Sequence, residues 1–201
     1  MNLFAKIILT TENEVKDFLI NRLSLVEKNI ENNLSIYTWI NKNSSEKENL
    51  ILIKYEISQE VNVNNYIMNN YDPLKIIIIW TSHIIDSLDL KDGDIMLPNT
   101  IINSKNEAIF LEYAPWENFD LNKFWLLLNW ICLTTNNQIS SLEELKEIKE
   151  NNSPDIIDED SFYILEKLSK NNLIDKLVLI KIIWKNQDNI QNWVDILELI
   201  L

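Results

Sequence analysis

A single glycine, Gly93, is the feature that most restricts this chain of 201 residues. Dinucleotide fingerprints, Walker loops, kinase Gly-rich loops and nucleophile elbows each need two or more glycines, because their backbone approaches a phosphate or turns sharply. The sequence therefore excludes all four. Positions with positive φ must fall mostly to asparagine, which occurs 29 times and tolerates that conformation. We expect chain breaks at the asparagine-rich stretches 32–33, 41–43, 64–65, 69–70, 136–137, 151–152 and 171–172.

The composition indicates a chain with a substantial core and no internal cross-link. It is 46% hydrophobic and 24% charged, so burial of apolar surface offsets the entropy of ordering. One histidine, His83, and one cysteine, Cys132, exclude a Cys/His zinc site and an internal disulfide. The longest wholly apolar runs, such as 76–80, have five residues and cannot span a membrane. Without a signal-peptide pattern, we expect a cytoplasmic protein with no cofactor and no metal.

Hydrophobic periodicity predicts two helices and a hairpin in the N-terminal half. A capping-box pattern followed by apolar residues at helical spacing predicts a helix over 12–32. Residues 35–41 and 50–58, the second of them with strict alternation, predict a β-hairpin with a long polar loop. The apolar spacing over 74–88, which follows a proline, favours a mostly buried helix.

Short β-like runs and then helices are expected in the C-terminal half. The β-like runs cover 94–103 and 107–113, while the continuous apolar run at 124–134 suits a central strand or a buried helix, and both are left open. Beyond Pro154 the pattern changes. It predicts three helices, over 162–170, 173–184 and 190–201.

These elements together predict an α+β fold. We expect a mixed or antiparallel sheet flanked by helices, with a helical C-terminal extension. The α+β domain is placed at 1–153, and the extension packed on it at 154–201.

Three features of the sequence could carry chemistry, and each has a simpler structural explanation. His83 and Asp86 lie three apart on the expected helix and could form a base with its orienting carboxylate. A half-buried histidine with a local hydrogen bond explains them more simply. Residues 86–94 contain four carboxylates but fail the ligand spacing of an EF-hand. Cys132 lies in an apolar run, which is typical of a packing residue, so no catalytic residue is assigned.

Acidic side chains concentrate in residues 107–160, where twelve acids oppose three lysines and give −9 of the total charge of −13. A solvated helix face with an acidic helix start explains this excess, and so does a surface that steers a basic partner. The same charge argues against binding to nucleic acid. Trp116, in an expected loop, is the candidate exposed anchor. The candidate partner-binding residues are Glu112, Trp116, Glu117, Asp120, Glu143, Glu144, Glu147, Glu150 and Asp158.

Five segments between residues 50 and 150 carry a family resemblance. They are, in order, LILIKYEI, PLKIIIIWTSHIIDSL, GDIML, EAIFLEYAP and WICLTTNNQISSLEELKEI. Their order resembles suppressor-of-fused-like domains, a family common among bacterial immunity proteins that neutralise toxins. The resemblance implies a strand at 124–134. It also implies a protein that binds a partner and has no catalytic residues.

Charge and resemblance together predict an immunity protein that is not an enzyme. It would bind a basic toxin domain, such as a nuclease, and occlude it through the acidic surface. Three alternatives stay open. The chain could be an acidic nucleic-acid mimic of a phage or mobile element, or a small hydrolase using Asp/Glu pairs and His83. It could also be an assembly subunit that forms a homo-oligomer through its apolar C-terminal helix.

Overall fold

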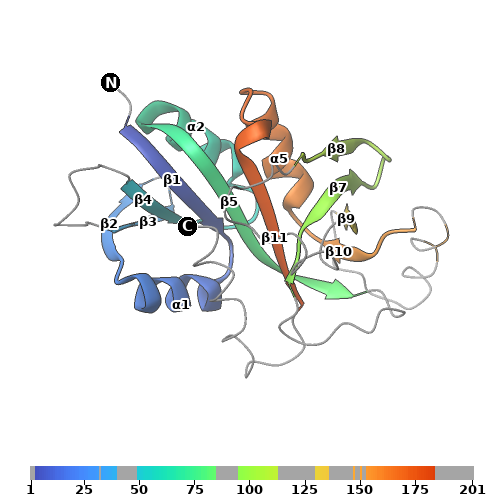
Figure 1. The fold of residues 1–201 in the computed structure, drawn as a ribbon, viewed down its shortest axis with the longest axis horizontal. Coiled ribbons are helices and arrows are strands. Elements are labelled where there is room, and N and C mark those ends of the chain that lie inside the picture. The colour runs from blue at the N-terminus through green and yellow to red at the C-terminus, as the bar shows by residue number, and fades with distance from the viewer. Residues whose placement is uncertain are drawn as a thin grey trace. The chain divides into compact units, whose positions relative to one another are not determined.

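The structure is a computed structural model that describes residues 3–31, 33–39, 49–84, 95–112, 130–135, 147, 150 and 153–183. The chain divides into two units. Unit 1 is Met1–Trp80 with Lys167–Val178, and unit 2 is Thr81–Glu166 with Leu179–Leu201. Figure 1 shows the helices and strands. None of the helices in the described part of the chain is long and apolar enough to cross a bilayer.

Unit 1 is built on a mixed sheet whose central strand is β1 (Leu3–Thr10). Strands β4 (Asn49–Lys54) and β5 (Tyr71–Ile84) pair with it on either side, and both are parallel to it. Strands β3 (Leu34–Trp39) and β2 (Val26–Glu31) extend the sheet by antiparallel pairing, so that the order is β2-β3-β4-β1-β5. The hairpin predicted over 35–41 and 50–58 is therefore confirmed.

The expected helix over 74–88 is wrong, because the chain forms strand β5 over Tyr71–Ile84. Residues Ile76–Ile79 are all fully buried, as are the consecutive residues Ile7–Leu9 of β1. A parallel strand covered on both faces is apolar at every position, so its sequence loses the alternation that marks a half-exposed strand. The β-branched isoleucines suit this extended backbone.

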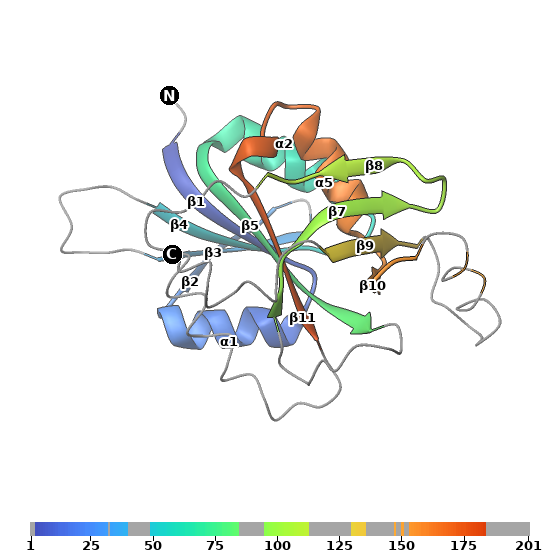
Figure 2. The same ribbon diagram turned by 45° about the vertical axis from the view of Figure 1, so that its right-hand side comes forward.

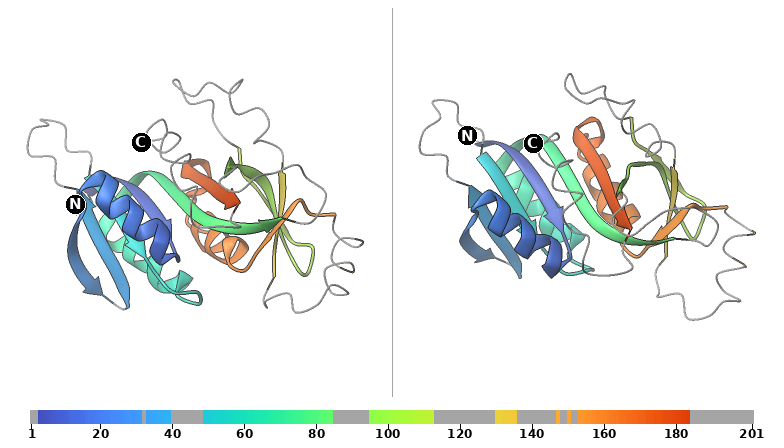
Figure 3. Two further views of the ribbon diagram at one scale, coloured as in Figure 1. Left: turned by 90° about the horizontal axis from the view of Figure 1, so that it is seen from below. Right: turned by 60° about the horizontal axis from the view of Figure 1, so that its bottom comes forward.

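Helices α1 (Asn13–Leu23) and α2 (Glu60–Asn70) flank the strands of this sheet (Figure 3). Val15 and Leu19 are the buried residues of α1. The helix expected over 12–32 stops early, since Ser24 adopts a left-handed conformation with φ of 51° and β2 follows. The predicted capping box is also absent, because the N-cap residue of α1 makes no side-chain cap hydrogen bond.

Asparagine supplies only some of the positive-φ positions and chain breaks that were expected of it. Among the described residues, the non-glycine positions with positive φ are three asparagines and three serines: Ser24, Asn33, Ser58, Asn106, Ser153 and Asn172. The asparagine pair at 64–65 lies inside α2 and does not break the chain, whereas the pair at 69–70 ends α2, and β5 follows directly. Gly93 lies outside the described residues.

Unit 2 contains three parallel strands in the order β10 (Ile156–Asp158), β9 (Trp130–Thr134) and β7 (Pro98–Asn103). Strand β8 (Ala108–Phe110) pairs antiparallel with β7, as the hairpin in Figure 2 shows. The last residues of β5, His83 and Ile84, pair antiparallel with β10. The β-like runs at 94–103 and 107–113 are thus strands, and so are the described residues of the run 124–134.

The segment after residue 154 differs most from the sequence-based prediction. Its described helices are α5 (Ser161–Ser169), as expected over 162–170, and a short 3₁₀ helix at Ile174–Lys176. The next expected helix is instead strand β11 (Leu177–Ile183), which pairs antiparallel with β6 (Ile95–Met96). The third expected helix, 190–201, lies outside the described residues. The fold is a mixed α/β one, and the boundary at residue 153 stays a prediction.

Candidate functional site

Polar side chains gather where the parallel strands of each unit end. In unit 1, β1 and β4 end side by side at Thr10 and Lys54, which are register partners. In unit 2, β7, β9 and β10 end at Asn103, Thr134 and Asp158. Ligands of α/β proteins bind outside the carboxyl ends of parallel strands, because the loops that follow these ends are free to vary. Each of these two sets of residues is therefore a candidate site of its own unit.

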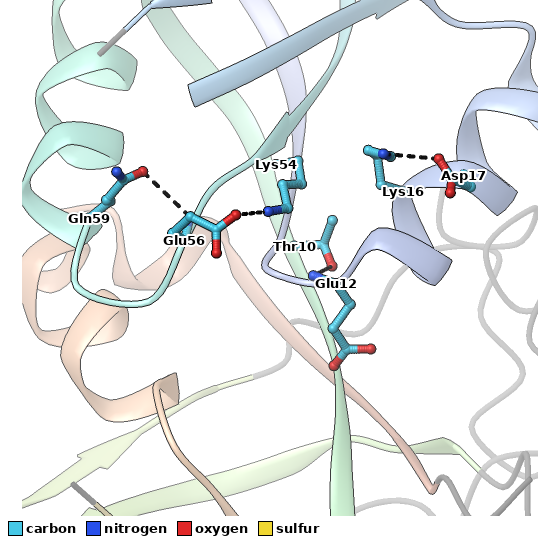
Figure 4. A network of polar contacts seen from close by, with 7 residues as sticks. All are labelled: Thr10, Glu12, Lys16, Asp17, Lys54, Glu56 and Gln59. Carbon is cyan, nitrogen blue, oxygen red and sulfur yellow. Dashed lines mark hydrogen bonds and ion pairs between the residues drawn. The ribbon is translucent and has the colours of Figure 1, made fainter. Parts of the chain in front are cut away.

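The end of β1 in unit 1 is held by local hydrogen bonds (Figure 4). Thr10 is fully buried, and its Oγ1 accepts a hydrogen bond of 3.2 Å from the amide of Glu12. At the neighbouring strand end, the ammonium of Lys54 forms an ion pair with the carboxylate of Glu56. The Glu56 amide in turn donates to Oε1 of Gln59 at 3.4 Å. These contacts fix the turns from which the side chains of Glu12 and Glu56 project.

Two carboxylates stand at the start of α1, directly after β1. Glu12 is the N-cap residue and is partly buried, and its carboxylate points away from Thr10 (Figure 4). Glu14 is exposed in the first turn. The positive end of the helix dipole favours negative charge at both positions. Lys16 pairs with Asp17, at 3.0 Å between Nζ and Oδ1. Unit 1 thus presents two carboxylates at the carboxyl end of its central strand.

A buried ion pair organises the corresponding edge of unit 2. Asp158, at the end of β10, pairs with Lys181 of β11, and their side chains are 3% and 0% exposed. Two hydroxyls also donate hydrogen bonds to this carboxylate. Thr134 Oγ1 donates to Oδ1 at 2.7 Å, and Ser161 Oγ donates to Oδ2. The four side chains come from β9, β10, β11 and the first residue of α5.

The same cluster fixes the start of α5. Thr134 Oγ1 accepts a hydrogen bond of 3.0 Å from the Phe162 amide, and the Thr135 amide donates to the Asp158 carbonyl at 2.8 Å. Asp160, which precedes the helix, is 6% exposed, and its carbonyl accepts from the Tyr163 amide at 3.2 Å. The buried carboxylate of Asp160 therefore lies on a turn that is fixed by hydrogen bonds of Asp158 before it and of Phe162 after it.

Electrostatics keep the buried pair charged. Burial on its own raises the pKa of Asp158, but the charge of Lys181 and the hydrogen bonds from Lys181, Ser161 and Thr134 bring it below its ordinary value. Burial lowers the pKa of Lys181, and the charges of Asp158, Cys132 and Asp160 more than reverse that effect, so the pKa ends above its ordinary value. Burial also raises the pKa of Cys132 well above its ordinary value, with Asp158 adding to the shift. A thiol in this state is a poor nucleophile, which fits the packing role predicted for Cys132.

The acidic surface predicted from the sequence is only partly described. Glu112, Glu147 and Glu150 are exposed, and their binding role stays a prediction. Asp158 was expected at a binding surface; its side chain is buried and ion-paired with Lys181, and its binding role stays a prediction. The remaining candidates, Trp116, Glu117, Asp120, Glu143 and Glu144, lie outside the described residues.

Sequence reasoning placed His83 on a helix, whereas it lies on strand β5 with Ile157 as its register partner. The predicted pairing of His83 with Asp86 assumed that both residues lie on one helix, and this assumption is wrong for His83. Asp86 lies outside the described residues. Reasoning from the sequence also missed Lys181. The available signal was a lysine inside the apolar run LVLIKII, because such a residue needs a buried counter-charge. Among the described residues, no group of three or more His, Cys, Asp or Glu side chains is placed to hold a metal ion.

Known proteins resemble the chain in fold rather than in sequence. No protein-family model and no curated protein matches the sequence. Futalosine hydrolase of Helicobacter pylori strain 26695 has a TM-score of 0.72 at 11% identity, over 99% of this chain and 97% of that chain. An MTA/SAH nucleosidase has a TM-score of 0.72 at 13% identity, over 100% and 96% of the two chains. The 5'-methylthioadenosine nucleosidase of Arabidopsis thaliana has a TM-score of 0.71 at 10% identity, over 97% and 88%.

These whole-chain likenesses overturn three expectations. The resemblance to suppressor-of-fused-like domains is wrong, because it rested on the order of short segments over half the chain. The predicted immunity function falls with it, and so does the expectation that the protein is not an enzyme, because the matched folds are those of nucleosidases. The error has a physical origin, since strands and helices recur in similar orders in unrelated folds. The chain has the fold of futalosine hydrolase and the methylthioadenosine nucleosidases.

Proposed function

We propose that the protein is a nucleosidase-like hydrolase that cleaves the bond between the sugar and the base of a purine nucleoside. The observation that carries this proposal is the likeness to nucleosidases over essentially the whole of both chains. Carboxylates at the carboxyl ends of the parallel strands support it, since hydrolysis of a sugar–base bond needs groups of this chemistry. The small hydrolase considered from the sequence is the alternative that this proposal develops.

The reaction requires a base for water and a proton for the leaving group. Water attacks C1' of the sugar while the bond from C1' to the base nitrogen breaks, and the base nitrogen takes up a proton. The positive charge that develops on the sugar in such reactions is stabilised by nearby carboxylates. A carboxylate at the carboxyl end of a parallel strand has the chemistry to accept the proton of the water.

Asp160 has the properties of a group that binds the sugar. It is 6% exposed and close enough to Lys181 for the two charges to interact. An ionised carboxylate is a pure acceptor, whereas sugar hydroxyls are donors, so the two make strong charge-assisted hydrogen bonds. We assign Asp160 to the sugar hydroxyls.

His83 is a further residue of unit 2 in the proposal. It lies next to the carboxyl end of β5, and imidazole is a common general acid in catalysis. Such a group supplies the proton to the leaving base. In His83→Ala, hydrolysis should fall while the protein stays folded.

The test is release of free adenine from 5'-methylthioadenosine, followed by chromatography, with futalosine and S-adenosylhomocysteine as further substrates. Wild type should release base. Glu12→Gln, Glu14→Gln and Asp160→Asn should each show which carboxylate takes part, by losing about 100-fold or more in kcat. Glu27→Gln removes an exposed carboxylate of strand β2, which pairs antiparallel with β3 and does not follow the end of a parallel strand, and it should be neutral. Folded wild type that releases no base from any of the three nucleosides would overturn the proposal.

A further inference from the structure

Lys181 is a fully buried lysine on a strand that is otherwise apolar. Stability alone does not account for such a group. Removing two charges from water costs several kcal/mol per ion in a protein interior, and replacing a buried pair with well-packed uncharged residues is often neutral or stabilising. The presence of this ion pair, despite its desolvation cost, is better explained by the residues that it holds in position.

The contacts of the pair lead to the start of α5. Lys181 holds the Asp158 carboxylate, which accepts hydrogen bonds from Thr134 and from Ser161. Thr134 in turn accepts from the Phe162 amide at 3.0 Å. These hydrogen bonds therefore hold Ser161 and Phe162, the two residues that directly follow Asp160.

The charge of Lys181 acts on the same turn. Its electrostatic partners are Asp158, Cys132 and Asp160. Asp158 forms an ion pair with it. The ammonium thus attracts a second carboxylate on the segment that it already anchors. Without this charge, two carboxylates and a thiol would share a dry site with no cation among them.

We propose that Lys181 is a positioning residue, which through Asp158, Thr134 and Ser161 fixes the turn that carries Asp160 and so orients the Asp160 carboxylate toward the sugar of the nucleoside. This role rests on the proposed function. It is distinct from catalysis, because Lys181 is buried and acts through other side chains. Misplacing a binding group by about 1 Å can lower a rate about 100-fold, so the role has a measurable consequence.

The experiment compares Asp158→Asn/Lys181→Met with wild type. The double variant removes both charges of the ion pair and preserves their shape, so it should unfold at a higher denaturant midpoint than Lys181→Met. Its kcat/KM for 5'-methylthioadenosine should fall about 100-fold. Lys181→Arg, which retains the charge, should recover part of the activity. The matched control is Lys176→Met, which removes an exposed partner of Asp72 at 3.5 Å and should change neither stability nor kcat/KM.

Amide hydrogen exchange gives a second measurement that needs no activity. In the double variant, the amides of Phe162 and Tyr163 should lose protection while those of β1 keep theirs. A double variant with unchanged kcat/KM, or with unchanged protection at these two amides, would overturn the positioning role. Inactive wild type would overturn the proposed function and with it the orientation toward a sugar. Hydrogen exchange would then still decide separately whether the pair fixes the turn.

Discussion

The carboxyl ends of the strands in the two units use similar chemical groups in different surroundings. In unit 1, Lys54 pairs with Glu56, and their side chains are 12% and 68% exposed. In unit 2, Lys181 pairs with Asp158, and their side chains are 0% and 3% exposed. Water screens the first pair and leaves the second almost unscreened. The same lysine–carboxylate contact is therefore weak in unit 1 and strongly coupled to the fold in unit 2.

Removing one charge from the buried pair should give the largest effect. Lys181→Met leaves the Asp158 carboxylate in the interior without its counter-charge, which should lower the free energy of unfolding by about 3–5 kcal/mol. Urea denaturation followed by circular dichroism measures this. A loss below about 1 kcal/mol would show that Asp158 is already compensated by Thr134 and Ser161.

The contribution of the Asp158–Lys181 pair to stability should be lost both at low pH and at high pH. The pKa of Asp158 is lowered in the folded state, so its contribution is present above its ordinary value of 3.8 and is lost as pH falls through the folded value. The pKa of Lys181 is raised, so its contribution is present below 10.5 and is lost as pH rises through the folded value.

Denaturant midpoints measured from pH 3 to 11 (a range chosen around the ordinary side-chain values) should therefore fall more steeply at both ends for wild type than for Asp158→Asn/Lys181→Met. Parallel profiles for the two proteins would contradict the assigned shifts.

Two buried threonines at strand ends offer a matched comparison of intermediate size. Thr134 is fully buried and bonds both the Asp158 carboxylate and the Phe162 amide, so Thr134→Val should cost about 2–3 kcal/mol. Thr10 is equally buried, and within the described part of the chain its hydroxyl accepts a hydrogen bond from the uncharged Glu12 amide, so Thr10→Val should cost about 1 kcal/mol. Paired urea titrations measure the difference. Equal losses would mean that the charge of Asp158 adds nothing to its hydrogen bond with Thr134.

The smallest effect belongs to the exposed pair of unit 1. Glu56→Gln should change the free energy of unfolding by less than about 1 kcal/mol, because solvent screens the contact with Lys54. Added salt should reduce even this difference. Measurements in low and high sodium chloride test it, and a loss as large as that of Lys181→Met would remove the contrast between the units.

The hairpin of β3 and β4 was predicted well because Lys54 and Glu56 alternate with Ile53 and Tyr55 at the end of the run, although Leu50–Ile53 are all buried. Strand β5 was mistaken for a helix because its isoleucines are buried on both faces, and an apolar run without alternation fits either structure. Helix α2 was missed because its asparagines were interpreted as breaks, although Val63, Tyr66 and Ile67 form its buried face.

The candidate site was harder to predict than the elements. Asp158 was assigned to an acidic surface because neighbouring residues in the sequence are acidic. Its actual partner, Lys181, is 23 positions away and was placed on a predicted helix. Local charge counting cannot find such a pair, since the contact depends on the packing of β10, β11 and α5. Glu12 and Glu14 were seen only as a helix start.

The sequence by itself determined which phosphate-binding and nucleophile loops are absent, because one glycine cannot supply their backbone conformations. It also determined that Cys132 is a packing residue and that the chain has a large apolar core. Only the tertiary structure decided that β5 and β11 are strands and that Asp158 faces Lys181 in the interior. The physical reason is that local pattern records how much of each residue is buried, whereas pairing between distant strands decides what each buried residue meets.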